Sequence, residues 1–154
     1  MSKSQMLTIG MVAHDRMKAP LLEWTTKNVK ALASHRFVAT GTTGKMLNEH
    51  LPRLDISPLK SGPFGGDQQM GALIAEGKLD ALFFFQDVMT AQPHDVDVKA
   101  LIRLSVLYEL PVACNRATAD MIVTSTLFGS KDSMPDHPDA QETFVGWLDR
   151  LSEN

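Results

Sequence analysis

The segment from Asp80 to Phe85, which reads D-A-L-F-F-F, constrains the fold more than any other stretch of the chain. Its apolar residues follow one another without alternation. A strand at a protein surface alternates apolar and polar residues, whereas a strand covered by helices on both faces is apolar throughout. This segment therefore predicts a central strand of a parallel sheet that has helices on both sides.

Segments typical of strands and of helices alternate along the rest of the chain. Pro20 stands in the first turn of one expected helix and Gly77 follows the end of another, where proline and glycine favour helix starts and stops. Pro58 lacks a backbone N–H, so its strand is an edge strand or a bent one. The pattern predicts strands at 7–13, 36–40, 54–60, 80–85 and 111–114, helices at 20–33, 67–76, 96–108, 119–127 and 143–151, and a short helix ending at 47.

Alternating strands and helices predict an α/β fold, with a doubly wound parallel sheet and right-handed crossovers. A length of 154 residues, with 44% hydrophobic and 21% charged residues, fits one domain that buries a full apolar core. We expect a single domain over residues 1–154, with a core at about 7–128 and a tail at 129–154 formed by a polar loop and a C-terminal helix.

The charge balance and the single cysteine limit the partners and the compartment. The net charge is −3, which excludes a strongly basic nucleic-acid binder, because neutralising phosphates requires a cationic face. Cys114 is the only cysteine, so an internal disulfide is impossible and a reducing compartment is favoured. The apolar stretch from Met6 to Ala13 is too short to cross a bilayer. We therefore expect a cytoplasmic protein that binds neither nucleic acid nor membranes.

Residues able to bind or react follow the carboxyl ends of the expected strands. They are His14, the T-G-T-T-G sequence at 40–44, the S-G-P-F-G-G-D sequence at 61–67, and Asp87 with His94. In an open parallel sheet these loops share one edge and converge on a crevice. The order of segments therefore predicts that residues distant in sequence form one site.

The segment from Thr40 to Gly44 is typical of a phosphate-binding turn between a strand and a helix. Its glycines let backbone N–H groups approach an anion, its hydroxyls are further donors, and the helix N-terminus is partly positive. Lys18 or Arg16 could add a cation. A plain turn with a threonine cap, and both cations on the surface, explains the same residues.

Asp67 follows a loop in which three glycines surround Phe64, and it opens a helix. Two roles explain an aspartate at this place. It is either the N-cap of the helix, a frequent role for this residue type, or a carboxylate directed into the crevice.

Asp87, His94, Asp95 and Asp97 form an acidic and imidazole cluster after the fourth expected strand. His94 could donate a hydrogen bond as a neutral imidazole, shuttle a proton, or lie in solvent. A metal site built on His14 and His94 lacks any H-x-x-x-H or C-x-x-C spacing, so we expect no metal. The sequence also lacks a G-x-S-x-G elbow and a Walker motif, which leaves serine hydrolysis and nucleoside triphosphate chemistry without support.

Seven sequence blocks stand in one order along the chain. They are V-A-H-D at 12–15 with Lys18, A-T-G-T-T-G at 39–44, S-G-P-F-G-G-D-Q-Q at 61–69, E-G-K at 76–78, F-F-Q-D at 84–87, P-H-D-V-D-V-K-A-L at 93–101 and P-V-A-C-N-R-A-T-A-D at 111–120. Together they resemble the methylglyoxal synthase family over about residues 7–128. The chain departs from the family pattern at Cys114, where a threonine or a small residue is expected, and in the tail from 129.

The resemblance implies a lyase that converts dihydroxyacetone phosphate into methylglyoxal and inorganic phosphate through an enediolate. It also implies a doubly wound five-stranded parallel sheet of the flavodoxin-like type, a homohexamer, and a reaction without metal or organic cofactor. Its partners would be the phosphorylated triose and inorganic phosphate.

The resemblance also assigns roles to particular residues. Asp67 would be the catalytic base, His94 would act in both catalysis and substrate binding, and Asp87 and Asp97 would be supporting acids. The substrate or its phosphate would be bound by His14, Lys18, Thr40, Gly41, Thr42, Thr43, Ser61 and Gly62.

Two other functions are compatible with the same fold. A regulatory module would bind a phosphorylated ligand without turnover, as a domain of this fold type does by resemblance in carbamoyl phosphate synthetases. An isomerase would convert the same substrate into an aldehyde phosphate and release no phosphate. The presence of Asp67, Asp87, His94 and Asp97 together favours the lyase.

Overall fold

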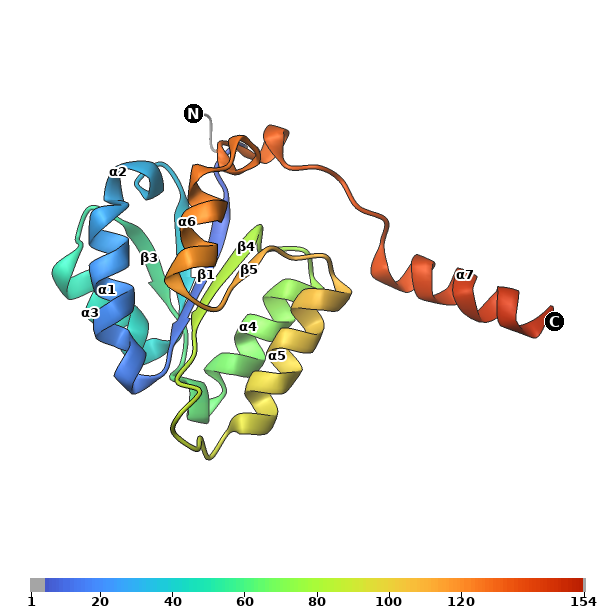
Figure 1. The fold of residues 1–154 in the computed structure, drawn as a ribbon, viewed down its shortest axis with the longest axis horizontal. Helices are drawn as coiled ribbons and strands as arrows, with labels where there is room; N and C mark the ends of the chain where they lie inside the picture. Colours follow the sequence, from blue (N-terminus) through green and yellow to red (C-terminus); the bar gives the residue numbers. More distant parts are fainter. Residues whose placement is uncertain (1–4, 154) are drawn as a thin grey trace.

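The computed structural model describes residues 5–153 and contains one five-stranded parallel sheet (Figure 1). Its strands are β1 (Thr8–Ala13), β2 (Arg36–Ala39), β3 (Asp55–Pro58), β4 (Ala81–Phe85) and β5 (Val112–Ala113). The strand order is β3-β2-β1-β4-β5, so β1 is central and β3, which ends at Pro58, is an edge strand. Each neighbouring pair is parallel; Ile9 of β1, for example, lies opposite Phe37 of β2 and Ala81 of β4.

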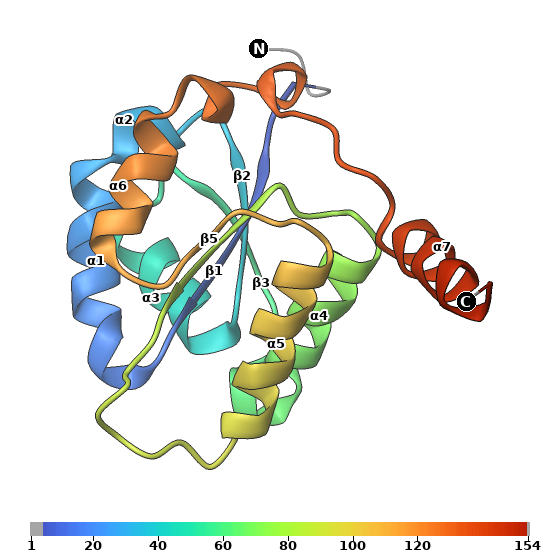
Figure 2. The same ribbon diagram turned by 45° about the vertical axis from the view of Figure 1, so that its right-hand side comes forward.

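Helices cover both faces of the sheet, as Figures 1 and 2 show from two directions. One face carries α1 (Lys18–Lys27), α2 (Val29–Leu32), α3 (Gly41–His50) and α6 (Arg116–Thr124), and the other carries α4 (Gly66–Ala75) and α5 (Asp95–Leu107). Successive side chains of a strand point to opposite faces. Phe83 therefore packs in the core beneath the first group of helices, and Phe84 packs in the core beneath α4 and α5.

The predicted fold class, a doubly wound five-stranded parallel α/β sheet of the flavodoxin-like type, is confirmed. The strand order reverses between β1 and β4, whereas flavodoxin itself has the order 2-1-3-4-5. In both arrangements ligands bind outside the carboxyl ends of the strands, where the order reverses. That edge of the sheet, at the bottom of Figure 1, receives the loops that follow β1 and β4.

The expected elements are all present, but several boundaries differ: α3 ends at His50 instead of 47, α7 begins at Ala140 instead of 143, and β3 and β5 are shorter than predicted. Two helices differ for a reason that the side chains show. The helix predicted at 20–33 is divided into α1 and α2, because the Asn28 side chain donates to the Trp24 carbonyl and its backbone leaves the helical conformation. The helix predicted at 119–127 begins at Arg116 instead, because the Asn115 side chain accepts from the Thr118 N–H and caps it. A short 3-10 turn, Thr126–Phe128, follows it.

The last helix stands away from the sheet. A 3-10 turn at Lys131–Ser133 is still joined to the segment before β1, because the Lys131 N–H donates to the Gln5 carbonyl. The helix α7 (Ala140–Ser152) follows, and the Asp139 side chain caps its N-terminus. Figures 1 and 2 both show α7 separated from the other helices. Among residues 5–153, no helix is long and apolar enough to span a membrane.

Candidate active site

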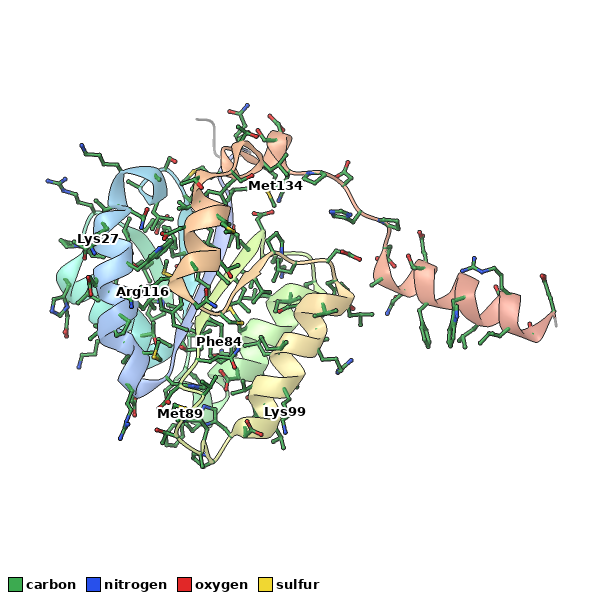
Figure 3. All side chains as sticks on the ribbon, in the orientation of Figure 1. Lys27, Phe84, Met89, Lys99, Arg116 and Met134 are labelled. Atoms are coloured by element: carbon green, nitrogen blue, oxygen red, sulfur yellow. The ribbon has the colours of Figure 1, made fainter. Side chains whose placement is uncertain are left out.

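The N-termini of three helices meet the loops at the carboxyl edge of the sheet. α3, α4 and α5 have Thr40, Gly65 and His94 as their N-caps, and in the described chain no side chain at these N-caps accepts a capping hydrogen bond. Such N-termini present unpaired N–H groups and a positive partial charge. In Figure 3 this edge lies near Phe84, with Met89 in the loop beyond β4. The edge is therefore suited to an anionic ligand.

The T-G-T-T-G turn packs directly against the loop that follows β3. The Gly41 N–H donates a hydrogen bond of 3.0 Å to the Lys60 carbonyl. A Cβ atom at Gly41 would lie only 2.8 Å from the backbone nitrogen of Ser61, so a side chain does not fit there. This close approach brings the two segments predicted to bind phosphate, 40–43 and 61–62, into contact.

A hydroxyl and a cation converge on the last residue of β1. Thr43 Oγ1 donates to the Ala13 carbonyl at 3.4 Å, and Lys18 Nζ donates to the same carbonyl at 3.2 Å. Lys18 also pairs with Asp15 at 2.7 Å, and its own side chain is only 18% exposed. Lys18 is therefore directed along the site edge and is not a freely solvated surface cation.

Asp67 lies in the first turn of α4 with its side chain only 2% exposed. The N-cap is Gly65, with a φ of 105°, so the N-cap role considered for Asp67 is wrong. Gly65 reaches this left-handed conformation without the steric cost of a side chain, and the helix therefore starts before the aspartate. The Asp67 carboxylate is thus left for another role.

The surroundings of the Asp67 carboxylate make it a stronger base than an ordinary aspartate. A Cβ atom at Gly62 would lie 3.2 Å from Oδ2, so the loop backbone packs against the carboxylate. Burial raises the pKa of Asp67, the nearby His94 opposes that rise, and the charge of Asp97 adds to it. Oδ2 is buried and has no hydrogen-bond partner in the described chain.

The backbone holds His14 in one tautomer. The Asp87 N–H donates to His14 Nδ1 at 2.9 Å, so Nδ1 is an acceptor and a neutral ring carries its proton on Nε2. Burial lowers the pKa of His14, and His94 lowers it further, so the ring stays neutral. Nε2 is buried without a partner, which makes it a donor available to a ligand.

His94 completes the site opposite His14. Its Nε2 lies 3.8 Å from Asp67 Oδ2, beyond hydrogen-bond distance, and its ring centroid lies 5.8 Å from that of His14. His94 Nδ1, His14 Nε2 and Asp67 Oδ2 are the buried side-chain atoms without a hydrogen-bond partner in the described chain. Buried polar groups without partners are costly, so their convergence at one place indicates a polar ligand.

The two other carboxylates support the site from its margins. Asp87 Oδ1 accepts hydrogen bonds from the N–H groups of Met89 and Thr90. The Thr90 side chain is the main cause of the lowered pKa of Asp87, and these two backbone bonds lower it further. The Asp87 carboxylate therefore remains ionised and stabilises the loop at 87–90, and the Asp87 N–H donates to His14 Nδ1. Asp97 accepts a hydrogen bond of 2.7 Å from Gln68 and stands near Asp67.

The structure brings most of the predicted site residues into one group of contacts. Thr42 differs, because it is exposed at the second position of α3. Asp15, which was given no role from the sequence, pairs with Lys18, and its position three residues earlier on the chain was the available signal. The residues that lie together are His14, Lys18, Thr40, Gly41, Thr43, Ser61, Gly62, Asp67 and His94, with Asp87 and Asp97 beside them.

Other parts of the described chain lack these features. Across residues 5–153, no group of three or more His, Cys, Asp or Glu side chains is arranged to hold a metal ion. A cleft of about 650 Å³ lies at the opposite edge of the sheet, where Leu79 and Pro111 precede β4 and β5. None of the site residues above lines that cleft.

Fold and site together define a class, the doubly wound α/β proteins in which helix N-termini suited to an anion lie beside a buried carboxylate. Within it, residues 20–114 match the family model described as an MGS-like domain. The chain is 59% identical over 117 residues to methylglyoxal synthase of Oleidesulfovibrio alaskensis. The aligned region covers 76% of this chain and 80% of that protein. It is 57% identical over 121 residues to methylglyoxal synthase of Pseudoalteromonas atlantica, covering 79% of this chain and 89% of that protein.

A solved structure agrees with these relatives. The crystal structure of methylglyoxal synthase from Elizabethkingia anophelis superimposes with a TM-score of 0.79 at 43% sequence identity, over 90% of both chains. The chain therefore belongs to the methylglyoxal synthase family.

Proposed function

We propose that the protein is a lyase with methylglyoxal synthase activity, which converts dihydroxyacetone phosphate into methylglyoxal and inorganic phosphate. The observation that carries this proposal is the buried Asp67 carboxylate, whose free Oδ2 faces two imidazoles beside a helix N-terminus suited to phosphate. The family membership supports the same reaction.

Proton abstraction comes first in the proposed mechanism. Asp67 removes a proton from the hydroxymethyl carbon, and the electron pair of the C–H bond forms the enediolate with the adjacent carbonyl. A carboxylate with a raised pKa is a better base for this step than an exposed aspartate. The loop backbone at Gly62 packs against the carboxylate, whose side chain is only 2% exposed.

The enediolate oxygen then requires hydrogen-bond donors. His14 supplies Nε2–H as a neutral imidazole, and His94 stands on the other side of the same space. A neutral donor stabilises the negative oxygen without fully protonating it, so the intermediate keeps the electrons needed for elimination.

Phosphate expulsion completes the reaction. The C–O bond to phosphate breaks, its electron pair leaves with the phosphate, and the resulting enol takes up a proton on carbon to give methylglyoxal. The N-terminus of α3, Lys18, and the Thr43 hydroxyl turned from the Ala13 carbonyl towards the phosphate stabilise the charge on the departing group. A C–O bond held perpendicular to the enediolate plane overlaps with its π electrons and favours elimination over isomerisation.

The test is an assay of purified protein with dihydroxyacetone phosphate, in which released phosphate and a diamine-trapped dicarbonyl are measured together. Equal amounts of both products support the lyase. An aldehyde phosphate without free phosphate identifies an isomerase instead. Substrate binding without any product identifies the regulatory module.

We further propose that the protein assembles as a homohexamer in the cytoplasm. Unpartnered apolar side chains support association, because Phe144, Trp147, Leu148 and Leu151 are exposed along one side of α7. The mass in solution, measured by light scattering, tests the assembly; a monomeric mass across the working concentration range contradicts it. Cell fractionation tests the compartment, and recovery in the membrane fraction contradicts it.

A further inference from the structure

Two consecutive glutamines follow the proposed base, and each holds a different wall of the site. Gln68 Nε2 donates a hydrogen bond of 2.7 Å to Asp97 Oδ1, across the gap between α4 and α5. Gln69 Oε1 accepts a hydrogen bond of 2.9 Å from the Lys60 N–H, in the loop that leads to Ser61 and Gly62. Both side chains belong to exposed residues, so neither is needed to fill the core.

The Gln68 contact fixes the first turn of α5. Asp97 lies in that turn, and its own N–H donates to the carbonyl of His94, the N-cap residue. A shift of α5 along α4 would therefore move the His94 ring relative to Asp67. The Nε2–Oδ2 distance of 3.8 Å carries no direct hydrogen bond, so the two helices set it.

The Gln69 contact fixes the opposite wall. Lys60 precedes the segment whose Gly62 backbone packs on the Asp67 carboxylate and whose Ser61 nitrogen abuts Gly41. Lys60 is thus tied on both sides, since its carbonyl accepts from Gly41 and its N–H donates to Gln69. A displaced loop would open the contact between Ser61 and Gly41 in the phosphate cradle and loosen the packing of Gly62 on Asp67, while His94 at the N-cap of α5 would keep its place.

We infer that Gln68 and Gln69 are positioning residues for the proposed reaction, Gln68 acting through Asp97 on the His94–Asp67 pair and Gln69 acting through Lys60 on the phosphate loop. This inference rests on the proposed function. Neither amide contacts the reacting atoms. Their effects should therefore fall on different kinetic constants, although the two residues are adjacent and chemically identical.

Gln68→Leu and Gln69→Leu are the matched variants, because each retains most of the side-chain volume and helix propensity while it removes the amide. For Gln68→Leu we expect kcat to fall about tenfold with KM nearly unchanged, the scale of a small misplacement of reacting groups. For Gln69→Leu we expect KM to rise about fivefold with a smaller change in kcat. Equal effects of both variants on both constants would overturn the inference.

A double-mutant cycle separates positioning from general destabilisation. If Gln68 acts through Asp97, Gln68→Leu has no further effect on kcat in an Asp97→Ala background, where no acceptor for the Gln68 amide remains. Full additivity of the two losses overturns the assignment. Lys99→Ala, at an exposed position two residues beyond Asp97, is the control that should leave kcat unchanged.

Imidazole NMR signals give a readout that does not depend on turnover. In ligand-free protein, Gln68→Leu should shift the His94 ring resonances and leave those of His35, in the loop before β2, unchanged. Unchanged His94 resonances overturn the inference even if activity falls. If the wild-type protein forms no methylglyoxal, the proposed function fails, whereas the NMR result still tests the positioning.

Discussion

Asp87 and His14 lie 73 positions apart in the sequence, yet the Asp87 N–H donates a 2.9 Å hydrogen bond to His14 Nδ1. The two residues follow β4 and β1, the neighbouring strands between which the strand order reverses. The bond leaves the proton of the neutral ring on Nε2, which, like Asp67 Oδ2, is buried without a hydrogen-bond partner in the described chain. A backbone group at the reversal point thus decides the chemical character of a side chain in the site.

Replacing the proposed base should stop proton abstraction and preserve ligand binding. Asp67→Asn keeps the size of the side chain and removes its basicity, so we expect kcat to fall by about 100-fold or more. Phosphate affinity, measured by calorimetry, should stay close to that of the wild type. Asp95→Asn is the control, because Asp95 lies nearby on α5 but pairs with the exposed Lys99. Wild-type activity in Asp67→Asn would remove this residue as the base.

The same substitution should stabilise the folded protein. Burial raises the pKa of Asp67, so its charged form opposes folding, and this cost grows as the pH rises through the folded-state pKa. A neutral amide avoids that cost. We expect the Tm of Asp67→Asn at pH 8 to exceed that of the wild type by about 3 °C, which corresponds to about 1 kcal/mol for a chain of this size. A lower Tm, recorded by calorimetry, would mean that the carboxylate is well compensated.

Removing the buried hydroxyl at position 43 should weaken the hold on phosphate. Thr43→Ala loses the Oγ1 group that lies 3.4 Å from the Ala13 carbonyl. We expect KM to rise about tenfold, as for the loss of one hydrogen bond to a charged group, with a smaller effect on kcat. Thr43→Ser retains the hydroxyl and should stay close to the wild type. Similar values of KM for the alanine and serine variants would contradict this role.

Gly41→Ala should disrupt the contact between the phosphate turn and the loop after β3. The added Cβ would lie 2.8 Å from the Ser61 nitrogen and 2.9 Å from the Leu59 carbonyl oxygen, and backbone atoms cannot move aside cheaply. We expect a loss of about 2 kcal/mol in the free energy of unfolding, measured by urea denaturation. Gly129→Ala is the matched control, because its nearest contact would be at 3.6 Å. Equal stability of both variants would contradict the close approach.

Stability should also decrease on mild acidification, in part through His35. Burial lowers the pKa of this histidine below its ordinary value of 6.5, so the unfolded chain binds more protons than the folded one below that pH. The contribution of His35 is fully present above pH 6.5 and is lost as the pH falls towards the folded-state pKa. His35→Asn can still accept from the Leu7 N–H through Oδ1 but does not titrate.

Comparing the wild type with His35→Asn isolates the contribution of His35 to the pH dependence of stability. Between pH 7.5 and 5.5, the unfolding free energy of His35→Asn should fall less steeply than that of the wild type, by at most about 1.4 kcal/mol per pH unit. Parallel curves would show that His35 has the same pKa in both states.

The hydrophobic pattern of the sequence was sufficient to predict the sheet. Residues 81–85 are all apolar because the strand that they form is buried along its whole length. The grouping of His14, Asp67 and His94 also followed from their places after strands. Local hydrogen bonds were not predictable in the same way. The break at Asn28 depends on a side-chain amide reaching the Trp24 carbonyl, and hydrophobic patterns carry no record of it.

The roles of individual residues were predicted less completely than their location. Asp67 remained ambiguous between cap and base, because the choice depends on the left-handed φ of Gly65, which places the helix start two residues earlier. Asp15 and Gln68 were given no role, since their partners, Lys18 and Asp97, became evident only from side-chain geometry. Thr42 shares a motif with buried neighbours but is itself exposed, as one side of any helix must be.

The division of labour between Asp67 and the α3 N-terminus has an evolutionary consequence. In the proposed mechanism, anion capture draws largely on backbone N–H groups, which survive most changes of side chain, whereas proton abstraction depends on one carboxylate. A single substitution at position 67 would thus turn a catalyst into a receptor that still recognises phosphorylated metabolites. Gene duplication followed by such a change gives a short route from a metabolic enzyme to a sensor with the same scaffold.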